Sequence, residues 1–209
     1  MNKGFLSLIL HAHLPFVKHP EVEDCLEERW LFQAITDTYM PLLKTFFKLA
    51  EENVPYRVTV SLSPPLLDML EDSFLKKRYK TYLNNLIELS EKEPLARMYL
   101  NRFKQSYLDY TEMFGENLIK PWAMLEQNGY IELATSSATH GYLPLMLDKG
   151  AINAQIKTGI RTFRRYFGHT PQGFWIPECA YCPEIEPILR REGIRYFILE
   201  THGILYAPP

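Results

Sequence analysis

The sequence predicts a barrel-like α/β fold in which parallel strands alternate with helices. Short apolar runs of strand length recur along the chain, and charged segments with helical periodicity separate them. These separating segments are long, as crossovers between parallel strands must be. Polar side chains suited to catalysis follow most of the apolar runs, which indicates a site at the carboxyl ends of the strands. The expected strands cover residues 5–10, 56–63, 130–135, 173–176 and 195–199.

The composition limits the classes of partner. The 209 residues are 46% hydrophobic and 23% charged, with a net charge of −2. This length suits one good core or two small domains. No basic field is available, so nucleic acid and anionic membranes are poor partners. The apolar run near the N-terminus is too short for a signal peptide or a membrane span, so we expect a cytoplasmic protein.

The cysteines do not indicate a disulfide framework, because there are only three: Cys25, Cys179 and Cys182. The last two form a C-x-x-C pair, but a zinc or redox interpretation needs further ligands that the sequence does not offer. We interpret them as two incidental thiols at the start of a helix.

The first half of the chain leads from a strand into helices. The run 5–10 is followed by His11 and His13, which point the same way if the strand continues. A helix is expected from Glu27, with a kink or division at Pro41. After the second strand, residues 66–127 keep a helical pattern. That segment is longer than a crossover needs, so a helical insertion at about 66–128 is expected.

The second half of the chain places further polar residues after strands. His140 follows the third strand, and a helix is expected over 151–167. The fourth strand is stopped by Pro177, and Glu178 follows at once. Glu178 could equally be a helix N-terminal glutamate, favoured there by the helix dipole. Glu200 and His202 follow the fifth strand.

Two chemistries suit these strand-end residues, although a lone histidine in such a place is more often a packing residue. A retaining glycosidase needs two carboxylates about 5–5.5 Å apart, and Glu178 is a candidate nucleophile. Aromatic rings such as Trp175 and Tyr181 would then stack on sugars. The alternative is metal-dependent hydrolysis, in which the histidines and a carboxylate bind a divalent ion. The H-x-H pair lacks the further matched ligand motif that this alternative requires.

Three segments resemble successive motifs of glycoside hydrolase family 57, most closely its 1,4-α-glucan branching enzyme group. They are residues 11–16 (HAHLPF), 138–145 (ATHGYLPL) and 173–181 (GFWIPECAY). The resemblance implies a (β/α)7 barrel, which is a distorted TIM-like barrel, and a retaining mechanism without a metal or organic cofactor. It implies Glu178 as the nucleophile. The residues implied to bind the α-glucan substrate are His11, His13, His140, Trp30, Trp175 and Tyr181.

The sequence departs from the family pattern in one respect. The acid/base of the family is an aspartate in a later motif, followed by a helical domain, and residues 1–209 match only the N-terminal portion of the barrel. We therefore expect an incomplete (β/α)7 barrel and an inactive fragment of a glycogen- or starch-acting enzyme. Glu200 is not assigned as a substitute acid, because the resemblance gives it no such role. The oligomeric state is not indicated.

Alternative functions stay open at this point. α-Amylase or 4-α-glucanotransferase activity differs from branching by the choice of acceptor, which the barrel strands do not encode. A non-catalytic glucan-binding remnant and a metal-dependent polysaccharide deacetylase are alternatives of other classes. Binding without turnover would support the remnant, and sensitivity to chelators would support the deacetylase.

Overall fold

The computed structural model describes residue 4 and residues 6–206, and the chain forms two compact units. We call them the sheet unit and the helical unit. The sheet unit comprises Met1–Phe16, Tyr56–Leu67 and Glu126–Pro209, and the helical unit comprises Val17–Pro55 and Asp68–Leu125. The helical unit thus contains most of the segment expected as an insertion, and its role as an insertion stays a prediction.

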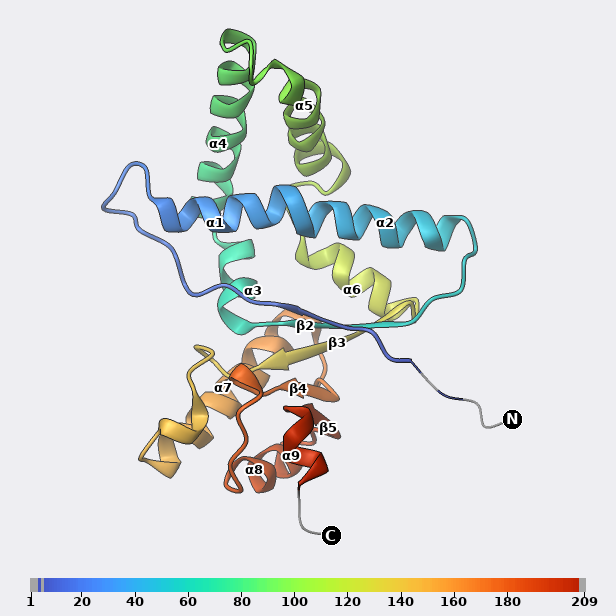
Figure 1. The fold of residues 1–209 in the computed structure, drawn as a ribbon, viewed down its shortest axis with the longest axis vertical. Coiled ribbons are helices and arrows are strands. Elements are labelled where there is room, and N and C mark those ends of the chain that lie inside the picture. The colour runs from blue at the N-terminus through green and yellow to red at the C-terminus, as the bar shows by residue number, and fades with distance from the viewer. Residues whose placement is uncertain (1–3, 5, 207–209) are drawn as a thin grey trace. The chain divides into compact units, whose positions relative to one another are not determined.

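The sheet unit is built on five parallel strands in the order β1-β2-β3-β4-β5, which curl into a half-barrel (Figure 1). This confirms the predicted parallel α/β architecture. Strand order equals chain order, and every neighbouring pair is parallel, so all five strands end at the same edge of the sheet. The strands are β1 (Ile9–Ala12), β2 (Val58–Leu62), β3 (Ile131–Ser136), β4 (Gly173–Trp175) and β5 (Tyr196–Ile198).

The first strand lies later in the chain than the sequence suggested. Residues 5–10 were expected to form it, but β1 runs from Ile9 through His11 to Ala12, and Phe5 lies outside the described residues. Leu6 is 99% exposed. Register pairs begin where Ile9 faces Thr59, and the preceding residue, Leu8, extends this pairing only by accepting a hydrogen bond from the backbone N–H of Thr59 at 3.1 Å. The expected bounds of the other four strands differ from the observed ones by one or two residues at an end.

Helices of the sheet unit bury its core. α7 (Lys149–Phe167) contacts β3 and α8 (Ile185–Arg191), and α9 (Thr201–Leu205) follows β5. Side chains from α7, β4 and α8, including Ile156, Phe174 and Ile188, form one apolar cluster. Gly159 lies where α7 meets β3, because a Cβ there would be 2.1 Å from the backbone oxygen of Ser136. The helix backbone therefore packs directly against the end of β3.

The helical unit consists largely of long amphipathic segments, and α4 and α5 lie side by side (Figure 1). A π-helical turn separates α1 from α2 and ends just before Pro41, which has no N–H to donate. The backbone stays helical from α1 through this turn into α2, so the helix is not divided at Pro41, and the expected kink or division there is replaced by a local change of helix type before Pro41. The helices along these segments are α1 (Leu26–Ala34), α2 (Met40–Glu51), α3 (Pro64–Glu71), α4 (Ser73–Lys92), α5 (Leu100–Leu108) and α6 (Ile119–Gln127).

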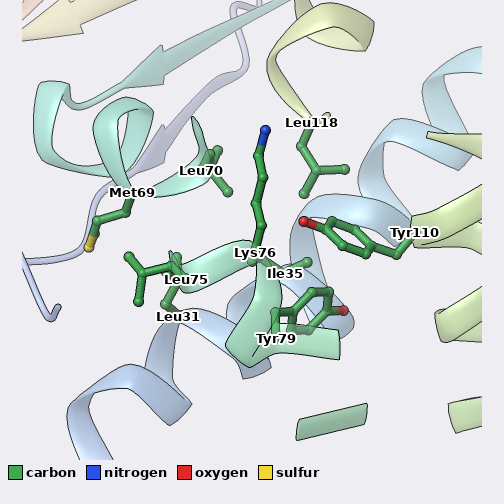
Figure 2. A pocket seen from close by; sticks show the side chains of 9 residues that line it. All are labelled: Leu31, Ile35, Met69, Leu70, Leu75, Lys76, Tyr79, Tyr110 and Leu118. Atoms are coloured by element: carbon green, nitrogen blue, oxygen red, sulfur yellow. The ribbon is translucent and has the colours of Figure 1, made fainter. Parts of the chain in front are cut away.

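A small internal pocket in the helical unit is shown in Figure 2. Leu31, Ile35, Tyr79 and Tyr110 line it, and the side chain of Lys76 extends through it. Its cavity volume is about 10 Å³, which is space for roughly one water molecule. The pocket is therefore a packing gap and not a site for a sugar. Among the helices that the structure describes, none is long and apolar enough to cross a membrane.

Candidate active site

Four aromatic rings stack at the carboxyl edge of the sheet. His11 lies in β1, His13 follows it, His140 lies in the loop after β3, and Trp175 is the last residue of β4. The ring centroids of His11 and Trp175 are 4.2 Å apart, with an angle of 8° between the rings. His140 stacks on His13 at 3.8 Å and lies 5.1 Å from His11. The structure thus brings together all three predicted histidines and one predicted tryptophan, and their assignment to sugar binding stays a prediction.

Glu178 stands on a turn with an unusual backbone. Pro177–Cys179 is a single 3-10 turn in which Glu178 has φ 53° and Cys179 has φ 54°. His140 shares this left-handed conformation, with φ 55°. The interpretation of Glu178 as a helix N-terminal glutamate is therefore wrong, because its backbone is not helical. Such conformations are costly for residues other than glycine and are frequent at active sites.

The imidazole cluster is neutral near pH 7. Burial, together with the smaller effect of the neighbouring imidazoles, lowers the pKa of His11 to about 4 and that of His140 to about 3. Burial also lowers the pKa of His13, whereas the nearby carboxylate of Glu178, which is exposed, acts in the opposite direction. The site therefore presents one exposed anion beside uncharged rings that can exchange hydrogen bonds.

Two serines at strand ends hold two of the rings. The Oγ of Ser63, which follows β2, lies 2.9 Å from Nδ1 of His13. The Oγ of Ser136, the last residue of β3, lies 2.9 Å from Nδ1 of His140 and donates to the backbone oxygen of Trp175 at 2.8 Å. By contrast, both nitrogens of His11 are buried and have no hydrogen-bond partner within the described part of the chain.

Sequence reasoning missed Ser63 and Ser136 as contributors to the site. Each is a small polar residue at the point where an apolar strand gives way to a loop: Ser63 follows β2, the neighbour of β1, and Ser136 ends β3, the strand that His140 follows. That position was visible in the sequence. Their partners were not, because they depend on how neighbouring strands are aligned.

The three histidines do not form a metal-ligand set. Their rings face one another in stacks, whereas metal ligation requires the in-plane lone pairs of the nitrogens to converge on one point. Among the residues that the structure describes, His, Cys and carboxylate ligand atoms converge elsewhere, at His19, Cys25 and Glu27 in the helical unit. The arrangement at the sheet edge thus suits hydrogen bonding to a ligand better than metal binding.

The remaining predicted site residues have other surroundings. Trp30 lies on α1 in the helical unit and is 43% exposed. The ring of Tyr181 stacks on Phe197 with 5.9 Å between centroids, and its hydroxyl donates to Glu186 at 3.4 Å. These contacts connect Tyr181 to β5 and α8. The assignment of Trp30 and Tyr181 to substrate binding stays a prediction.

Glu200 and the Cys179–Cys182 pair were given no role in the site by the sequence. The backbone N–H of Glu200 donates to the oxygen of Cys179 at 3.4 Å, which places the end of β5 beside that turn. Cys179 and Cys182 are both free thiols, and burial raises the pKa of each. Raised thiol pKa values disfavour the thiolate, which is consistent with the interpretation of the pair as incidental thiols.

Comparison with known proteins places this geometry in a family. The family model for glycosyl hydrolase family 57 matches residues 7–207. The 1,4-alpha-glucan branching enzyme TK1436 of Thermococcus kodakarensis is 35% identical over 99% of this chain and 34% of its own length.

Solved structures agree with the sequence match. A GH57-type branching enzyme of Pyrococcus horikoshii superimposes with a TM-score of 0.91 and 33% identity, covering 98% of this chain and 43% of that one. The alpha-amylase AmyC of Thermotoga maritima gives a TM-score of 0.87 and 34% identity, covering 96% of this chain and 40% of that one. This chain therefore spans less than half the length of these relatives. With the stacked histidines and the Glu178 turn inside the matched region, the chain belongs to glycosyl hydrolase family 57.

Proposed function

We propose that this chain provides the donor-sugar site and the nucleophile of a retaining enzyme that transfers segments of α-1,4-glucan to form α-1,6 branches. The observation that carries the proposal is the exposed carboxylate of Glu178, held on a left-handed turn beside a cluster of neutral imidazoles and Trp175. A neutral sugar needs hydrogen bonds and ring stacking rather than charge pairing, and this edge of the sheet offers both.

In the proposed reaction, a carboxylate oxygen of Glu178 attacks the anomeric carbon of the donor. The bond from that carbon to the glycosidic oxygen breaks, and the leaving oxygen takes a proton from a second carboxyl group. A hydroxyl of the acceptor then displaces Glu178 while the same second group accepts its proton. We propose that this second carboxyl group lies outside the 209 residues, as the family resemblance implies, so that the chain is the nucleophile portion of a larger active site.

Branching is favoured over hydrolysis because two of the three relatives described above are branching enzymes. α-Amylase activity is the second candidate, since AmyC matches at a similar identity of 34%. Both candidates share the glycosyl-enzyme step on Glu178 and differ only in the acceptor. The first test therefore addresses the step that they share.

The test uses α-maltotriosyl fluoride, whose leaving group departs as fluoride and needs no proton. If the nucleophile portion is competent, the C1–F bond breaks, a bond from C1 to Glu178 forms, and the ester accumulates because no general base removes it. Intact-mass spectrometry should show the chain heavier by one maltotriosyl group. Peptide mapping should place that group on Glu178.

Two variants complete this test. Glu178→Gln should abolish labelling, because an amide cannot act as the nucleophile. Glu200→Gln is the matched control at a neighbouring carboxylate and should label like the unmodified chain. Labelling that survives Glu178→Gln, or folded protein that never labels, would overturn the assignment of the nucleophile.

Amylose tests the placement of the acid/base. Loss of general acid–base help reduces rates by roughly 10²–10⁴-fold, so the chain alone should show little or no branching or hydrolysis of amylose. Turnover that Glu178→Gln abolishes would show that a second carboxyl group of this chain serves as the acid. Glu200→Gln would then become the variant that identifies it.

A further inference from the structure

We propose that Ser136 is a positioning residue that fixes His140 as the Nδ1–H tautomer, so that Nε2 of His140 accepts a hydrogen bond from a hydroxyl group of the substrate. The tautomer follows from the geometry of the free protein. The role toward a hydroxyl rests on the proposed function, in which His140 contacts a sugar.

The hydroxyl of Ser136 has two hydrogen-bond partners and one proton. Its Oγ lies 2.8 Å from the backbone oxygen of Trp175 and 2.9 Å from Nδ1 of His140. A carbonyl oxygen can only accept, so the single hydroxyl proton of Ser136 is used on Trp175. The hydrogen bond to His140 can then form only if Nδ1 of the imidazole donates.

The ring of His140 is uncharged. Burial disfavours a second proton on it, and its contacts with the rings of His13 and His11 act in the same direction. A neutral imidazole carries one N–H, and Nδ1 holds it. Nε2 therefore has a lone pair and acts only as a hydrogen-bond acceptor.

The surroundings of Ser136 keep its hydroxyl in this orientation. Ser136 is 0% exposed, and Trp175 is its register partner on β4. Rotation of the hydroxyl away from Trp175 would lose the 2.8 Å hydrogen bond at a buried side chain, which is unfavourable. His140 is also held by its own backbone, whose N–H donates to the oxygen of Ser137 at 3.2 Å.

Ser63 shows why the assignment is specific to Ser136. Its Oγ lies at the same 2.9 Å from Nδ1 of His13, but in that pair either atom can be the donor. The tautomer of His13 is therefore open and that of His140 is not. An acceptor at His140 Nε2 selects a ligand group that donates, such as a sugar hydroxyl, and disfavours an ether oxygen at the same place.

The experiment reads the tautomer directly from imidazole ¹⁵N chemical shifts of the 209-residue chain near pH 7.5, without any sugar. The resonances of His140 are assigned with a His140→Asn variant. The expected result is a protonated Nδ1 and an unprotonated Nε2. An Nε2–H tautomer in the unmodified chain would overturn the proposal whatever any variant does.

The variants Ser136→Ala and Ser137→Ala, the second as matched control, test whether Ser136 sets the tautomer of His140. Ser137 is the adjacent buried serine, and its Oγ has no hydrogen-bond partner among the described residues. Ser136→Ala should move His140 toward a mixture with the Nε2–H tautomer, and Ser137→Ala should leave it unchanged. An unaltered tautomer in a folded Ser136→Ala chain would overturn the role of Ser136.

Titration with maltotriose tests the role toward a hydroxyl. The Nε2 shift of His140 should change on binding, and Ser136→Ala should weaken binding by about tenfold, the effect of losing one hydrogen bond. Maltotriose that binds without moving the Nε2 shift would overturn this role. The proposed function fails separately, by the absence of Glu178 labelling with maltotriosyl fluoride, even where the tautomer of His140 is as assigned.

Discussion

The imidazole ring of His13 stacks on that of His140 with 3.8 Å between ring centroids and an angle of 21° between the rings. The two residues come from the ends of β1 and β3, and β2 lies between these strands in the sheet. The curl of the half-barrel brings them into contact over the end of the intervening strand. Two imidazolium ions could not share this place, so the contact requires at least one neutral ring.

This requirement predicts acid sensitivity. The pKa of His11 is lowered to about 4 and that of His140 to about 3, so the unfolded chain binds more protons than the folded chain below about pH 6.5. Their contribution to stability should be complete above pH 6.5 and should be lost as the pH falls toward 3. Urea unfolding midpoints measured from pH 8 to pH 4 check this.

The control for the acid sensitivity is His140→Asn, which removes one of the two strongly shifted groups. Its unfolding midpoint should fall less steeply below pH 6.5 than that of the unmodified chain. Equal slopes would mean that other groups cause the acid sensitivity.

His11→Phe should stabilise the free protein while it weakens sugar binding. Both nitrogens of His11 are buried without a hydrogen-bond partner in the described structure, and phenylalanine keeps the stacking on Trp175. Removal of unsatisfied polar atoms should raise the free energy of unfolding by about 1 kcal/mol. Thermal unfolding and maltotriose titration measure the two effects, and a destabilised variant would contradict the prediction.

Gly159→Ala should destabilise the sheet unit despite the better helix propensity of alanine. The new Cβ would lie 2.1 Å from the oxygen of Ser136, a backbone atom that cannot move aside alone. We expect the clash to outweigh the propensity gain of about 1 kcal/mol and to lower the free energy of unfolding by roughly 2 kcal/mol. Thr158→Ala on the same helix is the control and should change stability by less than about 0.5 kcal/mol. Denaturant unfolding measures the stability of both variants, and a Gly159→Ala chain as stable as the Thr158→Ala chain would contradict the predicted clash.

Glu28→Ala should be among the most damaging substitutions in the helical unit. Glu28 is 1% exposed, accepts from the backbone N–H of His19 at 2.8 Å and pairs with Arg78 at 2.6 Å. Loss of one member of a buried pair costs about 3–5 kcal/mol. Glu23→Ala, at an exposed glutamate, should be nearly neutral. Comparable denaturant midpoints for the two variants would contradict the buried role of Glu28.

Local signals explain how much of the fold was predictable. Pro177 ends the fourth strand as expected, and Gly129 and Gly193 adopt the left-handed conformations, with φ 72° and 86°, that helix ends favour. These features depend on one residue and its chain neighbours. The predicted start of β1 was wrong because the true start depends on where β2 begins. The residues around position 5 carry no information about the position of β2.

The site was predictable as a set of residue types but not as an arrangement. His11, His13, His140 and Glu178 could be named because each lies close to or just after the end of a strand. Their stacking and the bridge through Ser136 result from the curl and register of the sheet, which connect residues distant in sequence. The hydrophobic pattern of a single segment does not show which residues of other segments it will contact.

The left-handed backbones of His140, Glu178 and Cys179 lower the stability of the folded chain. Each side chain with a Cβ in that conformation costs about 1 kcal/mol or more, which glycine would avoid and asparagine would reduce. Asn53 and Glu116 in the helical unit share the conformation, so positive φ alone does not mark a catalytic residue. Under the proposed function, the stability lost at His140 and Glu178 is the cost of holding their side chains toward the substrate.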